Sequence, residues 1–198
     1  MSRVLLTGFQ PFHRASSNPS EAIVNEIVSR KIPEVFGEVL PVVFGESAKK
    51  LLTRIEEVKP DVVIALGQAE GRNQITPERI AINLDDARIA DNAGNSPAES
   101  PVITNGANAF FTTLPVKEIV GEIQGAGIPA SVSLTAGTFV CNHIFYHLQN
   151  YTSSKVIKSG FIHVPLMDSQ APEFPGLPTM SLGKMVEAIL IAIKVSQR

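Results

Sequence analysis

Residues 62–67 read Val-Val-Ile-Ala-Leu-Gly, an uninterrupted apolar run that ends at a glycine. Both faces of such a segment are apolar, which is typical of a parallel strand covered by helices on its two sides. Residues 4–7 and 160–165 are further short strand-like segments. Other stretches carry apolar side chains at helical spacing, as in the series Ala48, Leu51, Leu52, Ile55 and Val58. Alternating strands and helices predict an α/β fold, a three-layer α/β/α sandwich around a mostly parallel, mixed and twisted sheet.

Three more segments are predicted to be extended. Residues 39–43 are expected near a sheet edge, because Pro41 cannot donate a ladder hydrogen bond. Residues 130–134 are expected to form a strand that leads into a helix. Residues 75–83 are expected to be extended with alternate side chains on one face, namely Thr76, Glu78, Ile80 and Ile82.

The rest of the chain offers no boundary between domains. The polar stretch 84–105 is predicted to be a long loop, and loops of this length are usually functional or disordered. No repeat, low-complexity tract or linker interrupts the sequence. One domain that spans residues 1–198 is therefore expected.

Composition narrows the possible classes of protein. The chain of 198 residues is 44% hydrophobic and 18% charged, which favours a folded domain over a disordered chain. A net charge of −2 supplies no basic field for nucleic acid or an anionic membrane, and no apolar run approaches the roughly 20 residues of a membrane span. The single cysteine excludes an intrachain disulfide, and the N-terminus lacks a signal-peptide pattern, so a cytoplasmic protein is expected.

The candidate site lies where the predicted parallel strands end, because ligands bind beyond the carboxyl ends of strands in such sheets. Cys141 follows Gly137 in the turn between a predicted strand and a predicted helix, with Thr138 as the expected N-cap. In the first turn of a helix, free N–H groups and the helix dipole favour a thiolate. The alternative is that Cys141 is a small buried hydrophobic residue, as lone cysteines often are.

A cysteine nucleophile needs a proton carrier and a group that orients the carrier. His163 ends a strand and can approach Cys141 from across the sheet, although a histidine in such a place is often a hydrogen-bonded core residue. Glu78 shares its predicted face with isoleucines, so it needs a partner, either His163 or an arginine. The remaining histidines are expected to be structural or exposed: His13, His143 and His147.

Metal and nucleotide sites are not indicated. His143 and His147 have the i, i+4 spacing of zinc ligands on a helix, but residues 144–146 lack the glutamate of the metallopeptidase motif. Residues 8–11 lack the repeated glycines of a phosphate-binding loop. No serine has the context of a nucleophile elbow. No metal and no cofactor are therefore expected.

Residues 133–143 read Ser-Leu-Thr-Ala-Gly-Thr-Phe-Val-Cys-Asn-His. This run resembles the active-site segment of the pyroglutamyl peptidase I family, the pyrrolidone-carboxylate peptidases. The resemblance covers nearly the whole chain in order, through residues 5–12, 40–45, 67–72, 78–83, 85–89, 105–106 and 160–165. It implies a cysteine exopeptidase that removes an N-terminal pyroglutamyl residue from peptides through a Cys-His-Glu triad and a thioester intermediate.

The resemblance also implies roles for individual residues. Cys141 matches the nucleophile, His163 the base and Glu78 the orienting carboxylate. The residues that match the lining of the lactam pocket are Phe9, Phe12, Gln68, Ile89, Phe139 and Val140, and Arg88 matches a residue near the oxyanion. A pyroglutamyl ring is neutral and flat, so aromatic walls and a few polar groups can hold it.

Two segments depart from the family pattern. Pro77 precedes Glu78 where relatives carry a β-branched residue, and proline is expected to re-aim Glu78 slightly. Residues 166–170 read Leu-Met-Asp-Ser-Gln, where relatives tend to carry an aromatic residue and a proline–glutamate pair. This difference affects the local contacts of the loop. The alternatives are a catalytically impaired lactam-binding homologue or another cysteine amidase.

The family resemblance further implies a homotetramer or homodimer. The apolar Leu177 and Met180 are compatible with such assembly. The only other partners expected are N-terminally pyroglutamylated peptides, with no nucleic acid and no membrane.

Overall fold

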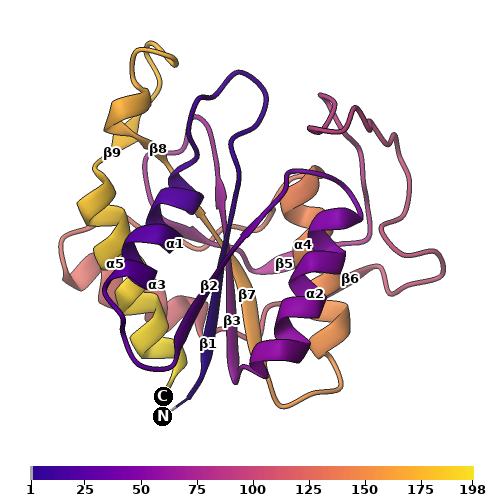
Figure 1. The fold of residues 1–198 in the computed structure, drawn as a ribbon, viewed down its shortest axis with the longest axis horizontal. Helices are drawn as coiled ribbons and strands as arrows, with labels where there is room; N and C mark the ends of the chain where they lie inside the picture. Colours follow the sequence, from indigo (N-terminus) through magenta and orange to yellow (C-terminus); the bar gives the residue numbers. More distant parts are fainter. Residues whose placement is uncertain (1) are drawn as a thin grey trace.

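The computed structural model describes residues 2–198, and its centre is a five-stranded sheet between two layers of helices (Figure 1). The strands lie in the order β2 (Val35–Leu40), β1 (Val4–Phe9), β3 (Val62–Gln68), β7 (Lys158–Val164) and β4 (Thr76–Pro77). The first four are parallel, and β4 runs antiparallel to β7 at the edge. The predicted α/β sandwich with a mixed, mostly parallel sheet is confirmed.

The helices cover both faces of this sheet. One face packs against α1 (Pro19–Ser29), α3 (Val116–Gly125) and α5 (Leu182–Ser196), and the other against α2 (Glu46–Val58) and α4 (Val140–Thr152) (Figure 1). Alternate residues of β3 enter opposite cores, since Ile64 belongs to the first and Val63 to the second. All seven residues of β3 are buried, as its apolar sequence predicts.

Smaller elements lie outside the central sheet. β5 (Ile80–Ile82) pairs with β6 (Ala109–Phe111), and β8 (Leu166–Met167) pairs with β9 (Thr179–Met180). A short 3₁₀ helix, η1 (Asp168–Gln170), follows β8. Within the described chain, residues 83–108 form the predicted long loop, which carries an isolated bridge between Asp85 and Ser100. Among residues 2–198, no helix combines the length and apolar character needed to cross a membrane.

Two predicted strands are wrong in extent. The strand expected at residues 39–43 instead runs from Val35 to Leu40, because Pro41 lacks the N–H that would continue the ladder. Residues 130–134 form only isolated bridges, from Ala130 to Ile75 and from Ser133 to Glu78. Their partners Ile75 and Glu78 lie on either side of β4, and Pro77 between them has no N–H to donate, so the ladder is interrupted there.

The extended segment expected at residues 75–83 is divided between two sheets. The chain leaves the central sheet after Pro77, and β5 then pairs with β6. The predicted face, which places every second side chain on one side of a single strand, therefore does not continue beyond Glu78. Ala81 is buried, whereas Ile80 and Ile82 are only half-buried. The predicted burial of Glu78 is confirmed, since its side chain is fully inaccessible.

Close packing at the end of β1 holds the turn that begins the candidate site. A Cβ atom at Gly8 would lie 2.4 Å from the carbonyl oxygen of Ser20, so only glycine allows α1 to approach this closely. The Ser20 hydroxyl accepts a hydrogen bond from the N–H of Phe9 at 2.9 Å. Residues 9–12 therefore leave the strand in a fixed direction, over the carboxyl edge of the sheet.

Candidate active site

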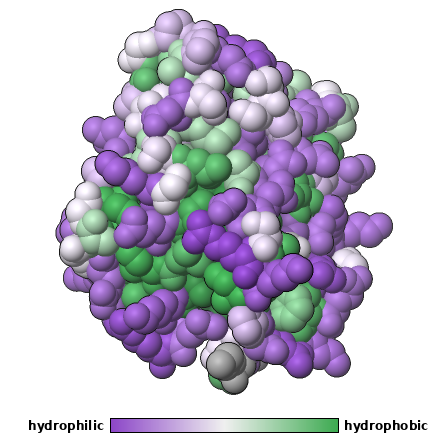
Figure 2. All heavy atoms as spheres, turned by 60° about the vertical axis from the view of Figure 1, so that its left-hand side comes forward, coloured by the Kyte–Doolittle hydropathy of each residue, from purple (hydrophilic) through white to green (hydrophobic). Residues whose placement is uncertain are grey.

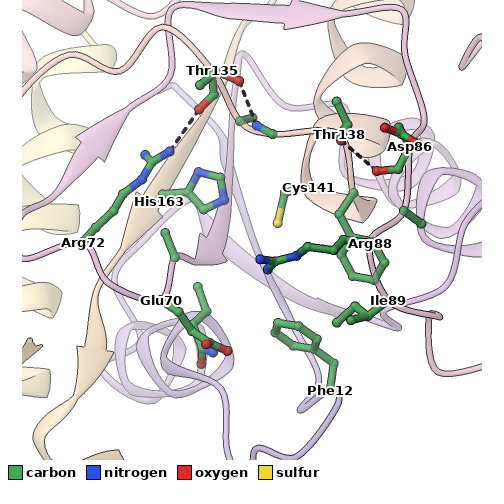
Figure 3. Close-up of a pocket in the computed structure, with 16 residues that line it drawn as sticks. Phe12, Glu70, Arg72, Asp86, Arg88, Ile89, Thr135, Thr138, Cys141 and His163 are labelled. Atoms are coloured by element: carbon green, nitrogen blue, oxygen red, sulfur yellow. Dashed lines mark hydrogen bonds between the residues drawn. The ribbon is translucent and has the colours of Figure 1, made fainter. Parts of the chain in front are cut away.

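A cavity of about 780 Å³ opens at the carboxyl ends of β3 and β7 and at the start of α4 (Figure 3). Cys141 and His163 lie in its wall, with five of the predicted pocket residues: Phe12, Gln68, Arg88, Ile89 and Phe139. A narrow apolar cavity adjoins it, and the other two predicted pocket residues, Phe9 and Val140, line that one. The structure therefore gathers every predicted pocket residue around the cysteine.

Cys141 occupies the first turn of α4, as predicted, because the helix begins at Val140. The expected N-cap is wrong. The cap is Phe139, and the hydroxyl of Thr138 instead donates to the carbonyl oxygen of Asp86 at 2.8 Å. Thr138 thus ties the start of α4 to the long loop, and the first N–H groups of the helix remain available to a ligand.

The sulfur of Cys141 lies directly over Gly67. A Cβ atom at this glycine would be 2.9 Å from Sγ and 2.7 Å from the ring of Phe161. Gly67 pairs with His163 in the register of β3 and β7, and neighbouring strands are only about 4.8 Å apart. Sγ therefore sits beside the imidazole of His163, and Figure 3 shows the two side chains facing the same cavity.

Glu78 lies behind His163, away from the cavity. Its Oε1 accepts a hydrogen bond from Nδ1 of His163 at 2.7 Å. Because Nδ1 carries the proton that a carboxylate requires, the lone pair of the imidazole is on Nε2. Pro77 does not keep Glu78 from reaching the histidine.

Arg72 is a member of this cluster that sequence reasoning did not identify. Its Nη1 lies 2.7 Å from the same Oε1 of Glu78 and 2.6 Å from Oγ1 of Thr76, and Nη2 donates to the carbonyl oxygen of Thr135 at 3.0 Å. Both partners considered for Glu78, a histidine and an arginine, are thus present. The only signal in the sequence was the resemblance of residues 67–72 to the family.

Burial and charge set the protonation states of these groups. Burial favours a neutral carboxyl, but the hydrogen bond and charge of His163, with the charge of Arg72, hold the pKa of Glu78 below its ordinary value. Burial lowers the pKa of His163, although Glu78 opposes the shift. Burial and the negative charge of Glu78 raise the pKa of Cys141 to about 12. The unliganded site therefore favours a neutral thiol beside a neutral imidazole.

A second histidine–carboxylate pair lies outside both cavities. Nδ1 of His143 is 2.8 Å from Oδ2 of Asp85, and its Nε2 accepts a hydrogen bond from the N–H of Gly45 at 3.1 Å. His143 is buried and the ring of His147 packs edge-on against it, with ring centroids 4.6 Å apart. His13 is exposed. These three histidines are outside both cavities, in the structural or exposed positions expected for them.

No group of three or more His, Cys, Asp or Glu side chains among residues 2–198 is placed to hold a metal ion. Gln68, Arg88 and His163 are among the polar residues that line the cavity with Cys141, and the others are Glu70, Arg72, Asp86, Thr135 and Thr138. This set suits proton transfer and hydrogen bonding to an amide-containing ligand.

Known proteins of similar sequence and structure fit this geometry. The family model described as Pyroglutamyl peptidase matches residues 2–198. The pyrrolidone-carboxylate peptidase of Erwinia tasmaniensis is 48% identical over 198 residues, which is 99% of this chain and 93% of that protein. The protein of the same name from Bacillus mycoides is 47% identical over 200 residues, with the same two coverages.

Solved structures agree along almost the entire chain. Pyroglutamyl peptidase I from Bacillus amyloliquefaciens superposes with a TM-score of 0.94 at 44% identity, over 98% of this chain and 94% of that one. Pyrrolidone carboxyl peptidase from Pyrococcus furiosus gives a TM-score of 0.94 at 40% identity, over 98% of each chain. The chain described here therefore belongs to the pyroglutamyl peptidase family.

Proposed function

We propose that Cys141, His163 and Glu78 are the nucleophile, the base and the orienting carboxylate of a cysteine exopeptidase that hydrolyses the bond after an N-terminal pyroglutamyl residue. One observation carries the proposal. The Cys141 sulfur lies beside the imidazole of His163, at the edge of a cavity with aromatic walls. Nδ1 of this imidazole is hydrogen-bonded to the buried carboxylate of Glu78. This is the arrangement that activates a thiol.

The narrow cavity supports a pyroglutamyl substrate. Phe12 and Phe139 form its walls with ring centroids 6.2 Å apart, and Phe44 packs edge-on against Phe139. None of the described residues that line it has a charged side chain. Nε2 of Gln68 is buried and has no hydrogen-bond partner among residues 2–198. The narrow cavity holds only about 10 Å³, so its aromatic walls must move apart to admit a ring. A neutral ring with a carbonyl oxygen placed between them would pair with that donor, whereas the ammonium group of an ordinary peptide N-terminus would find no counterion there.

The proposed mechanism begins from the neutral pair. Nε2 of His163 takes the proton from Cys141 as Sγ bonds to the carbonyl carbon of the pyroglutamyl residue. The N–H of Cys141, in the first helical turn, and Arg88, which reaches across the cavity in front of Cys141 in Figure 3, stabilise the charge on oxygen. His163 then gives the proton to the leaving amine, which leaves a thioester. Water attacks the thioester with His163 again as base, and 5-oxoproline and the thiol are released.

An amide panel tests the proposal against its two alternatives. We expect chromogenic pyroglutamyl amide to be cleaved at least about 100-fold faster, in kcat/KM, than alanyl amide. A lactam-binding homologue without turnover would bind pyroglutamyl amide and release no chromophore. Another cysteine amidase would cleave the alanyl compound at a comparable or higher rate. Either result would overturn the proposed function.

Substitution of Glu78 by glutamine is expected to lower kcat by about 10²-fold, less than loss of the nucleophile, because an amide oxygen can still accept from His163 but cannot stabilise its charged form. Glu78 raises the pKa of His163 against the effect of burial. Its removal therefore lowers that pKa further, and the acid limb of the kcat/KM profile moves to lower pH. An unchanged rate and an unchanged profile would make Glu78 a structural partner of Arg72 only.

We also propose a homo-oligomer of single-domain subunits, in the cytoplasm. Figure 2 shows an apolar area on the side of the molecule that carries α1, α3 and α5, and Ile32, Val35 and Leu190 line a groove of about 630 Å³ near the ends of α1 and α5. This area supports assembly better than the region suggested by sequence. Leu177 is 36% exposed, but Met180 is buried and offers no surface to a partner.

A further inference from the structure

Gln170 is a fully buried glutamine beside the proposed site, and all of its amide atoms are engaged. Its Oε1 accepts a hydrogen bond from the N–H of Met167 at 2.9 Å. Its Nε2 donates to the carbonyl oxygen of Ser17 at 3.1 Å and to Oε1 of Gln68 at 3.0 Å. Gln170 lies in η1, within the segment that departs from the family pattern, and it lines neither cavity.

Two backbone partners determine which way the amide of Gln170 faces. The N–H of Met167 can only donate, so it requires the oxygen of Gln170, and the carbonyl of Ser17 can only accept, so it requires the nitrogen. The atom of Gln68 that meets this nitrogen must in turn be its oxygen. The hydrogen-bond chain therefore orients the amide of Gln68, with Oε1 toward Gln170.

The other end of the Gln68 amide is consequently a donor without a protein partner. Nε2 of Gln68 is buried and makes no hydrogen bond within residues 2–198. Gln68 lines both cavities, but the narrow one exposes no polar surface, so a ligand reaches this donor only as the cavity widens around it. A buried donor without a partner is unfavourable, so a ligand that supplies an acceptor there gains relative to one that does not.

We propose that Gln170 is a positioning residue that sets Gln68 as a hydrogen-bond donor and thereby selects substrates with a ring carbonyl. This inference rests on the proposed function, because it concerns recognition of the same pyroglutamyl ring. The ring carbonyl distinguishes pyroglutamate from a simple five-membered ring. With Gln68 held in this orientation, a ligand that has the ring carbonyl binds more tightly than a ligand of the same shape that lacks it.

Two neutral inhibitors isolate the ring carbonyl: 3-oxocyclopentanecarboxamide, a carbocyclic analogue of pyroglutamyl amide, and cyclopentanecarboxamide, which lacks the carbonyl. We expect the unsubstituted protein to bind the first at least about tenfold more tightly, measured as the ratio of the two competitive Ki values. In Gln170→Met, which keeps the shape of the side chain, the amide of Gln68 is free to turn, and this ratio should fall below about three. KM for pyroglutamyl amide should rise about tenfold while kcat stays within about threefold.

Gln170→Glu provides a second, independent variant. A carboxylate at this position still accepts from Met167 but would also accept from Nε2 of Gln68, which turns the Gln68 oxygen toward the cavity. The Ki ratio should then fall to about one or below. The matched controls are Gln149→Met and Gln149→Glu, because Gln149 is equally buried but donates to Oγ of Ser159, away from both cavities. The controls should lose stability and keep the Ki ratio.

A double substitution shows whether Gln170 acts through Gln68. If it does, Gln170→Met should change the Ki ratio less than twofold when Gln68 is already leucine, since coupled residues are not additive. A Ki ratio unchanged in the folded Gln170 variants, or a full additional effect in the double variant, would overturn the inference. Failure of the proposed function is a separate result, because the amide panel on the unsubstituted protein would then show no cleavage of pyroglutamyl amide, or cleavage of alanyl amide at a comparable rate.

Discussion

Replacement of Cys141 by serine is expected to lower kcat/KM for pyroglutamyl amide by at least about 10⁴-fold. The reason is the acidity of the nucleophile. Burial and the charge of Glu78 raise the pKa of the Cys141 thiol to about 12, so His163 must remove its proton during the attack. A serine hydroxyl is a much weaker acid in the same surroundings, and the neutral imidazole of His163 is a poor base for it.

Alkylation of the unsubstituted protein provides the matching measurement. Cys141 is the only cysteine of the chain, so one equivalent of iodoacetamide should add a single group and abolish turnover. With the thiol pKa raised, the alkylation rate should continue to increase above pH 9. A plateau near pH 6 would instead indicate a preformed thiolate–imidazolium pair. Retention of a tenth of the original rate by folded Cys141→Ser would remove Cys141 from the mechanism.

Local sequence was sufficient for the parts of the molecule that depend on one strand or one helix. The apolar run of β3 predicted a strand buried on both faces, and the glycine turn before Cys141 predicted a cysteine at a helix start. The position of His163 at a strand end predicted its approach to Cys141, because parallel strands end at one edge of the sheet. Burial of Glu78 was also expected, but the reason was wrong, because Ile80 and Ile82 lie in the separate strand β5 and are only half-buried.

Contacts that depend on how distant segments fold back were not predictable in this way. Arg72 meets Glu78 because the chain turns between β3 and β4, and Gln170 meets Gln68 across a separation of 102 residues. Neither contact leaves a periodic pattern in the sequence. The capping role expected for Thr138 failed for a related reason, since its hydroxyl bonds to Asp86 in the long loop. Local propensity does not include such tertiary partners.

The protein contains an internal comparison for the proposed base. His163 and His143 are both buried, and each places Nδ1 within 2.8 Å of a carboxylate oxygen, from Glu78 or Asp85. They differ at the other nitrogen. Nε2 of His143 is occupied by the N–H of Gly45, whereas the ring of His163 lines the cavity beside Cys141. Of these two histidines, only His163 therefore has a ring nitrogen without a hydrogen-bond partner among residues 2–198, which can exchange a proton with a substrate.

Substitution of His163 by alanine is expected to lower kcat by about 10³-fold or more, because no other group can take the thiol proton and return it to the leaving amine. His143→Ala should keep kcat within about threefold and instead lose about 2–4 kcal/mol of unfolding free energy, since it leaves Asp85 buried without its partner. Kinetics and urea unfolding of both variants measure the contrast. Added imidazole should restore part of the rate in His163→Ala by entering the vacated space beside Cys141, and none in Cys141→Ser. Full activity in folded His163→Ala would exclude this histidine as the base and leave its bond to Glu78 a structural contact, like that of His143 to Asp85.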